Sequence, residues 1–284
     1  MTALRQRFIE DLQLHGFALS TQRVYVAAIK LLARHYRQSP DQLTEEQIRQ
    51  YFLFLTNERK VSRSHATITL CAIKFLYEQT LQRPWPVFRL ARPRREHKIP
   101  AVMSRGEVRQ LLACFRAPFY RVFFTTVYAC GLRVSEGVQL QVSDVDGPRL
   151  LLHVRGKGSR DRYVPLPAPV LHMLRRFWKT HRSVPWLFPS PCAKSKIRPV
   201  SRERIQRVFN ATRPRFGLNK HVTIHTLRHS YATHLLEAGV NLRLIQAVLG
   251  HNSPKTTALY THLTVPACAL LDSPIQQLVQ DLCP

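Results

Sequence analysis

The stretch IHTLRHSYATHLLEAG, residues 224–239, places two histidines and an arginine at helical spacing. His225 and Arg228 are one turn apart at an expected helix N-terminus, where free backbone N–H groups and the helix dipole favour an anion. His225 and His229 also have the i, i+4 spacing of a zinc-binding helix. However, the glutamate of an HExxH motif is missing between them, and an adjacent arginine repels a divalent cation. The stretch therefore favours a phosphate site over a metal site.

A second stretch, LGHNSPKTTALYTH at residues 249–262, carries a histidine and a tyrosine. His251 follows a glycine, and Ser253 with Pro254 begins a short expected helix that carries Tyr260. Taken alone, Tyr260 is more often a packing residue than a catalyst. The other candidate residues along the chain decide between these two readings.

Two weaker signals lie upstream. In GLRVSEGVQL, Arg133 and Glu136 are three residues apart on one helical face, a spacing that is usually structural. In RLLLHVRGKGSRDRYVPLP, two β-rich arms at 150–155 and 162–166 predict a hairpin with Lys157 at its tip. A lysine there can swing into a groove, although exposed turn lysines are common.

Together these residues form an inventory for phosphoryl transfer without a metal. Ionising a tyrosine with a pKa of about 10 costs roughly 4 kcal/mol at pH 7, and cationic surroundings lower that cost. Fixed guanidinium and imidazole donors stabilise charge on an attacked phosphodiester by on the order of 3 kcal/mol each. A mobile lysine can protonate the leaving alkoxide.

The composition points to a nucleic-acid partner. The 284 residues include 43 Lys+Arg against 17 Asp+Glu, a formal net charge of +26. Such an imbalance costs self-repulsion, so a polyanionic partner is expected, DNA first and an anionic membrane second. No signal peptide or long apolar run is visible, and the six cysteines show no metal or disulfide spacing. A cytoplasmic, DNA-facing protein with reduced thiols is expected.

The order of patterns predicts a mainly α-helical protein with a small β-sheet, in two domains. Residues 1–83 read as four helices, residues 84–100 as a basic, proline-rich linker that is either solvated or lies along phosphates, and residues 101–284 as the larger domain. Its signals are a Ser104–Glu107 capping box, a helix over 118–129, the hairpin, and helices interrupted by a proline-rich loop at 183–200. In the first domain, Ser20, Ser64 and a Thr44–Gln47 capping box are the expected helix starts. The expected inward stripes are Leu4, Phe8 and Leu12; Val24, Ala28, Leu31 and Leu32; and Ile73, Leu76 and Tyr77.

The motifs ACGLRVSE, GKG, HTLRHSYATHLLEAG and LGHNSPKTTALYTH, in this order, resemble the tyrosine recombinase (phage integrase) family. The resemblance covers 101–284 closely and extends more loosely to 1–83, which is similar to the family's SAM-like core-binding domain. It implies a C-shaped clamp on DNA and site-specific cutting and rejoining through a 3′-phosphotyrosine and a Holliday junction. It implies no cofactor, because the covalent link conserves the bond energy.

Carried over by position, the resemblance assigns each candidate a role. Arg133, Arg228 and His251 would hold the scissile phosphate, and Glu136 would support them. Lys157 would protonate the 5′-hydroxyl, His225 would assist proton transfer, and Tyr260 would attack.

The resemblance also implies an assembly. The tail helix 273–284 has an apolar stripe that would dock either on its own domain or, as in the family, on a neighbour in a tetramer on inverted-repeat core sites. The two-domain layout fits Xer-like, integron and transposon or phage settings alike, at the bacterial nucleoid. A type IB topoisomerase-like activity and a non-catalytic DNA-binding accessory role are the alternatives.

Overall fold

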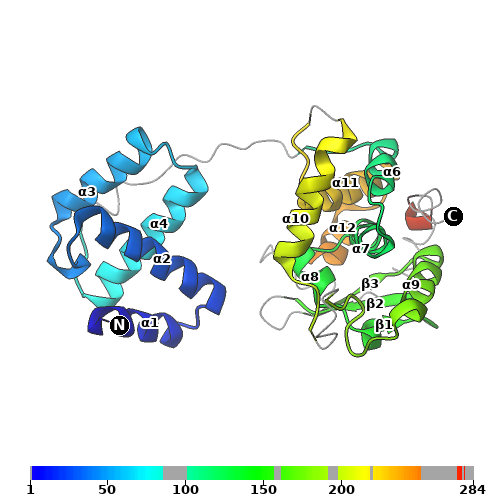
Figure 1. The fold of residues 1–284 in the computed structure, drawn as a ribbon, viewed down its shortest axis with the longest axis horizontal. Coiled ribbons are helices and arrows are strands. Elements are labelled where there is room, and N and C mark those ends of the chain that lie inside the picture. The colour runs from blue at the N-terminus through cyan, green and yellow to red at the C-terminus, as the bar shows by residue number, and fades with distance from the viewer. Residues whose placement is uncertain are drawn as a thin grey trace. The chain divides into compact units, whose positions relative to one another are not determined.

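The computed structural model describes residues 2–85, 101–156, 161–190, 198–217, 220–250, 274–276 and 278. The chain divides into two compact units, Met1–Lys98 and Ile99–Pro284, and each is treated by itself. Figure 1 shows the helices of the first unit in blue and cyan and those of the second in green to red. Within the described ranges, no helix has the length and apolar character needed to cross a membrane.

The N-terminal unit is built from helices that close on one aromatic core. Its helices are α1 (Ala3–Leu14), α2 (Leu19–Tyr36), α3 (Glu45–Leu53) and α4 (Arg63–Phe75), with π-helical turns at Phe54–Glu58 and Leu76–Thr80 and a 3₁₀ turn at Pro40–Gln42. The expected Thr44–Gln47 capping box is present, since Thr44 Oγ1 accepts from Gln47 N and Gln47 Oε1 accepts from Thr44 N. Phe8, Leu12, Ile73, Leu76 and Tyr77 are buried as predicted.

Two details of this unit differ from the sequence prediction. The residue before α2 is Ala18 rather than Ser20, and α4 is capped by Ser62, whose hydroxyl accepts from His65 N, rather than by Ser64. On α2, Ala28 and Leu32 are buried, but Val24 and Leu31 are 46% and 42% exposed. The inward face of α2 turns toward α4 and includes the partly buried Tyr25 and Ile29, which places positions 24 and 31 outside it.

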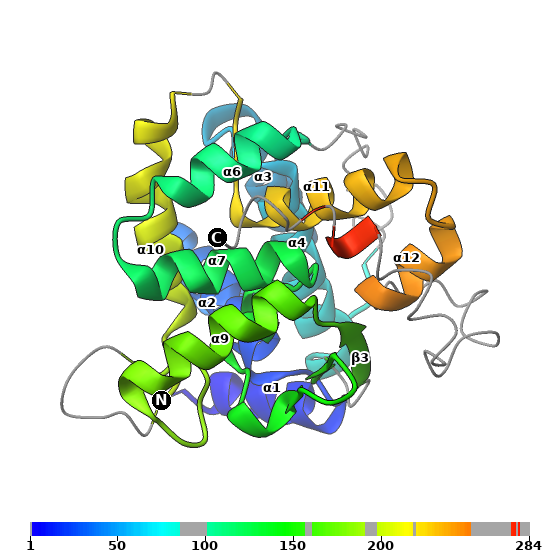
Figure 2. The same ribbon diagram turned by 90° about the vertical axis from the view of Figure 1, so that its right-hand side faces the viewer.

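The second unit is a helical layer around one central helix. Its helices are α6 (Arg105–Ala113), α7 (Pro118–Ala129), α8 (Val134–Val138), α9 (Ala168–His181), α10 (Arg202–Thr212), α11 (Ile224–Glu237) and α12 (Leu242–Leu249). Helix α7 contacts α6, α8, α9 and α11. Figure 2 shows it running between α6 and α9. The predicted Ser104–Glu107 capping box and the predicted helix over 118–129 are confirmed.

A small antiparallel sheet lies beside these helices. Strands β1 (Val145–Asp146), β2 (Leu151–Val154) and β3 (Arg162–Pro165) follow the order β1-β2-β3. The β2–β3 hairpin confirms the prediction from the two β-rich arms, with Leu152 opposite Val164 and Val154 opposite Arg162. The sequence did not predict β1, which has only two residues and no apolar pattern of its own.

The C-terminal segment packs on the core of its own unit. Residues 274–276 and 278 are helical, and Ile275 and Leu278 are 1% and 4% exposed within the core cluster of the second unit. Figure 2 draws this segment in red. The rest of the predicted tail helix 273–284 lies outside the described residues, as does most of the predicted linker 84–100.

Candidate active site

The turn between α7 and α8 positions Arg133. Gly131 has a φ of +59°, and a Cβ there would lie 2.6 Å from the ring of Tyr231, so this close approach requires glycine. The chain then enters α8 with Arg133 at the N-cap, whose backbone N–H donates to Glu136 Oε2 at 2.8 Å. Arg133 and Glu136 therefore face each other across the first turn of α8, and the predicted pairing is confirmed.

Helix α11 positions Arg228. The helix starts at Thr223, whose N–H donates to Thr226 Oγ1 at 3.0 Å, and it buries Leu227 and Tyr231 against the core. Arg228 lies on the same inner side, and its side chain is only 7% exposed. Its Nη1 donates to Gly131 O at 2.7 Å, so the guanidinium is held beside the α7–α8 turn. The predicted placement of His225 and Arg228 in the first turns of a helix is confirmed.

Glu136 lies at the centre of three guanidinium groups. Its carboxylate accepts from Arg133 Nη1 at 2.7 Å and from both terminal nitrogens of Arg162 at 2.9 Å each, and Arg228 Nη1 is 3.6 Å away. Burial acts to raise its pKa, but the hydrogen bonds and charge of Arg162, and then those of Arg133, hold the pKa of Glu136 at about 2. The carboxylate is therefore charged at neutral pH.

The end of α12 supplies a second set of acceptors. Gly250 ends the helix with a φ of +63°, and the last carbonyl groups of the helix point at the arginines. The negative end of the helix dipole favours cations at this position. The three pairs are Arg162 Nε with Val248 O at 2.7 Å, Arg228 Nη2 with Leu249 O, and Arg133 Nη2 with Gly250 O at 3.3 Å.

Burial and neighbouring charges change the pKa of Arg228. Burial, followed by the positive charge of Arg133, lowers the pKa of Arg228 to about 10, and the charge of Glu136 acts in the opposite direction. Arg228 remains a cation at neutral pH. Arg133 is the more accessible of the two, with its side chain 38% exposed. The cluster thus offers one accessible and one buried guanidinium, both fixed by protein acceptors before any ligand binds.

His225 lies one turn before Arg228 and is exposed. Burial of part of its ring, followed by the charges of Arg202, His229, Arg228 and Arg133, lowers its pKa from the ordinary 6.5. The imidazole is therefore neutral at pH 7. Among the described residues, no three His, Cys, Asp or Glu side chains gather to hold a metal.

The sequence reasoning missed Arg162 and Arg202. Arg162 begins β3, and the two-residue period of a strand puts it on the same face as the buried Val164. An arginine on the buried face of a strand was the available signal. Arg202, the first residue of α10, was counted only as part of the net charge, because no local pattern links it to His225.

The other predicted site residues lie outside the described ranges. These are Lys157, His251 and Tyr260, together with the predicted short helix that begins at Ser253. Their described neighbours are placed: Gly156 N donates to Asp161 Oδ1 at 3.2 Å across the hairpin turn, and Gly250 ends α12 directly before His251.

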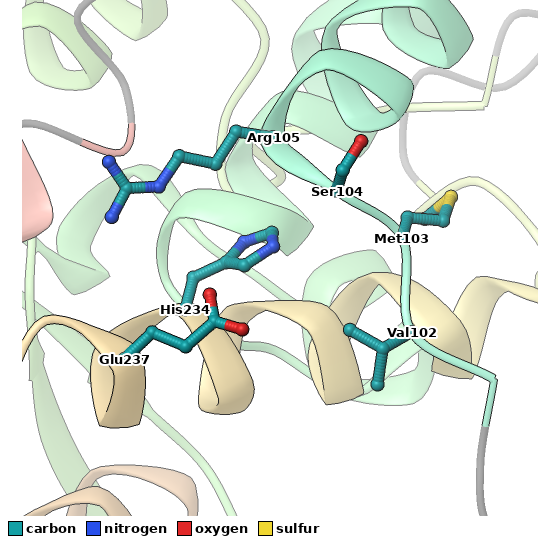
Figure 3. Close-up of a pocket in the computed structure, with 6 residues that line it drawn as sticks. All are labelled: Val102, Met103, Ser104, Arg105, His234 and Glu237. Carbon is teal, nitrogen blue, oxygen red and sulfur yellow. The ribbon is translucent and has the colours of Figure 1, made fainter.

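A separate pocket of about 380 Å³ lies at the other end of α11 (Figure 3). His234 and Glu237 line it from α11, and Val102, Met103, Ser104 and Arg105 line it from the segment that enters α6. His234 Nδ1 and Tyr128 Oη are 2.8 Å apart, so this histidine is tied into the core. Of the predicted site residues that the structure describes, Arg133, His225 and Arg228 do not line this pocket.

Comparisons with known proteins agree with the geometry. The phage integrase family matches residues 101–266, and its N-terminal SAM-like domain matches residues 4–87. A putative integrase/recombinase of Sinorhizobium fredii, y4qK, is 40% identical over 280 residues, covering 98% of this chain and 90% of that protein.

Solved structures extend the likeness to the fold. XerA recombinase has a TM-score of 0.50 at 27% identity over 99% of this chain and 98% of its own. A lambda integrase tetramer bound to a Holliday junction has a TM-score of 0.71 at 17% identity over 88% and 77%. These matches do not favour the topoisomerase-like or accessory alternatives. The chain belongs to the phage integrase family of tyrosine recombinases, enzymes that break and rejoin DNA strands.

Proposed function

We propose that this chain is a site-specific recombinase in which Tyr260 attacks a DNA phosphate held by Arg133, Arg228 and His251. The observation that supports this most directly is the fixed pair of guanidinium groups, Arg133 and Arg228, around Glu136. Two cations held in place before the reaction stabilise charge that develops on a phosphate without reorganising first.

The proposed step exchanges one ester bond for another. The phenolate oxygen of Tyr260 bonds to phosphorus, and the bond from phosphorus to the 5′ oxygen breaks. The phenol proton passes toward the neutral imidazole of His225, and Lys157 gives a proton to the departing 5′ oxygen. The 3′-phosphotyrosine then reacts with the 5′-hydroxyl of another strand, which restores the phosphodiester and frees the enzyme. No cofactor takes part in this scheme.

We assign the DNA-binding surface to both units. In the N-terminal unit the expected contacts are exposed basic side chains: Arg5, Arg7, Arg23, Lys30, Arg34, Arg63 and Lys74. Residues 1–83 would bind core DNA, residues 84–100 would follow the backbone as a basic linker, and residues 101–284 would cut. The protein would work at the nucleoid, in the cytoplasm.

The assembly that we propose is a tetramer on two synapsed sites, each built from inverted repeats. The lambda integrase neighbour was solved as a tetramer on a Holliday junction, which supports this arrangement by analogy of fold. Ile275 and Leu278 give the tail an apolar face that can pack on a hydrophobic surface. We propose that the tail leaves its own core and packs on the equivalent surface of the next protomer.

A nicked suicide duplex tests the chemistry. The duplex would be selected from a random-sequence pool by retention on the Tyr260→Phe protein, because binding does not need the nucleophile. The wild-type protein should form a covalent DNA complex that persists in EDTA. Tyr163→Phe, which alters a tyrosine on β3 that is 46% exposed, is the matched control and should react like wild type. Equal covalent product from wild type and Tyr260→Phe would disprove the assignment of Tyr260.

A further inference from the structure

The side chain of Arg162 uses its guanidinium donors in two directions. The two terminal nitrogens bind the two carboxylate oxygens of Glu136, and Nε binds Val248 O near the end of α12. The side chain is 11% exposed and cannot contact DNA broadly. A Cβ on Gly250 would lie 3.2 Å from Arg162 Cδ, so the arginine also lies against the residue that caps the helix. Arg162 therefore joins β3, α8 and α12.

The charges in this cluster indicate what the contact between Arg162 and Glu136 does. Three guanidinium groups surround one carboxylate, which leaves two net positive charges. Arg162 binds both oxygens of Glu136 in the bidentate geometry that suits a carboxylate best. Arg133 binds one oxygen through Nη1 at 2.7 Å, and Arg228 is 3.6 Å away. Arg162 thereby neutralises Glu136, and the charges of Arg133 and Arg228 remain available. A phosphodiester under attack carries about two negative charges, which the two net positive charges of the cluster match.

We infer that Arg162 is a positioning residue of the recombination reaction. It keeps the positive charges of Arg133 and Arg228 available to the phosphate, and it fixes the end of α12, which His251 follows in the sequence. This inference rests on the proposed function. Without Arg162, Glu136 would draw the two remaining arginines inward, and Val248 O would lose its donor. The loss should appear in the cleavage step rather than in DNA binding.

A competing explanation is that Arg162 only braces the hairpin that carries Lys157. Two leaving groups separate these explanations. A duplex with a 5′-bridging sulfur needs no proton on its leaving group, so defects that act through Lys157 disappear on it. Defects in the arginine cluster remain, because the phosphate still gains the same charge.

The experiment measures single-turnover cleavage of oxygen and sulfur versions of the selected duplex. Arg162→Met should slow both by about 10- to 100-fold, by analogy with the loss of a partner that orients a metal-binding residue. The dissociation constant for DNA should change less than threefold. Arg162→Lys, which keeps the positive charge but cannot bind both carboxylate oxygens with two parallel N–H groups, should recover part of the rate. Lys157→Ala should be slow on oxygen and close to wild type on sulfur.

Arg155→Met is the matched control, because Arg155 pairs with the buried Asp144 at the other arm of the same hairpin. Arg155→Met should cleave the sulfur duplex at close to the wild-type rate. Recovery of Arg162→Met on the sulfur duplex would overturn the inference and assign Arg162 to the hairpin.

A double-mutant cycle tests the route through Glu136. In a Glu136→Gln background, Arg162→Met should slow cleavage by clearly less than in the wild-type background, since no carboxylate remains to neutralise and only the bond to Val248 O is lost. A full loss in that background would show that Arg162 acts elsewhere. If wild type does not cleave, the proposed function fails, and the same cycle measured by thermal unfolding still tests the Arg162–Glu136 coupling on which the inference depends. Additive unfolding effects would overturn the Arg162–Glu136 coupling whatever the protein does to DNA.

Discussion

The backbone N–H of Met103 donates to Oγ of Ser230 at 2.9 Å, and both residues are fully buried. Ser230 lies two residues after Arg228 on α11, and its hydroxyl donates in turn to Thr226 O at 2.8 Å. The first described residues of the second unit are thereby fixed to the helix that carries His225 and Arg228. His225 and Arg228 lie in the first turns of the same helix, so this helix supports both the start of the second unit and the candidate site.

Replacing this hydroxyl should destabilise the catalytic unit. Ser230→Ala leaves the Met103 N–H buried without an acceptor, so the free energy of unfolding should fall by about 1–3 kcal/mol. Urea denaturation followed by tryptophan fluorescence measures it, since Trp178 and Trp186 are in this unit. Ser143→Ala, at an exposed position, should change the value by less than about 0.5 kcal/mol. Equal values for both variants would rule out the Met103–Ser230 bond as a support.

Glu136 should stabilise the fold in a pH-dependent way. Its pKa is about 2 in the folded protein and 4.5 in its ordinary state, so its contribution is complete above pH 4.5 and is lost as the pH falls through 2. Glu136→Gln should cost about 3 kcal/mol at pH 7, by the conversion of 1.36 kcal/mol per pKa unit. Thermal melts from pH 7 down to pH 3 should show the difference shrinking below pH 4.5.

The matched control for this prediction is Glu203→Gln, which removes an exposed carboxylate from α10. Its free energy of unfolding should stay within about 0.5 kcal/mol of the wild-type value at every pH. If the loss of unfolding free energy in Glu136→Gln stays constant between pH 7 and pH 3, the charge of Glu136 does not stabilise the fold.

The role of His225 should be visible in the pH dependence of cleavage. Its pKa is lowered from 6.5, so the neutral ring persists at pH 7 and is protonated only at more acidic pH. If the neutral ring accepts the proton, the wild-type cleavage rate should fall as the pH drops below 6.5. His225→Gln should be slower by about 100-fold at pH 7 and should lack that acidic limb.

His229→Gln is the control for His225. His229 is one turn further along α11, is exposed, and has a pKa lowered by burial and by Arg228. Its variant should keep the acidic limb. The same limb in His225→Gln as in wild type would exclude His225 as the proton acceptor.

The tail should be needed for assembly. Leu278→Asp places a charge on the buried face of the C-terminal segment, whereas Gln276→Asp alters the partly exposed side of the same turn. Sedimentation on the selected duplex should show that Leu278→Asp loses the four-chain complex and that Gln276→Asp keeps it. Cleavage of the suicide duplex by single chains should survive in both and so reports an intact fold. Four-chain complexes at wild-type yield with Leu278→Asp would contradict the proposed exchange of the tail.

The sequence predicted the features that follow from local patterns. Capping boxes at Thr44 and Ser104 and the hairpin arms are set by residues within a few positions of each other, and the structure confirms them. The inward face of α2 was predicted wrongly at Val24 and Leu31. That face depends on where α4 packs, and a helical period alone does not fix this rotation.

The site shows the same division between local and distant information. Arg133 with Glu136, and His225 with Arg228, are short-range pairs that the motifs predicted. Arg162 reaches Glu136 from 26 residues away and Val248 from 86 residues away, so only the folded chain brings them together. The predicted roles of Lys157, His251 and Tyr260 rest on their motifs and stay predictions.

The central claim is that Tyr260 makes the covalent bond to DNA. The most direct measurement is to trap the covalent complex of the wild-type protein on the suicide duplex, digest the protein, and identify the DNA-linked peptide by mass spectrometry. The account predicts a 3′-phosphate linked to the phenolic oxygen of Tyr260 and a free 5′-hydroxyl on the other fragment. An adduct on any other residue, or a 5′-phosphate linkage with a free 3′-hydroxyl, would contradict it.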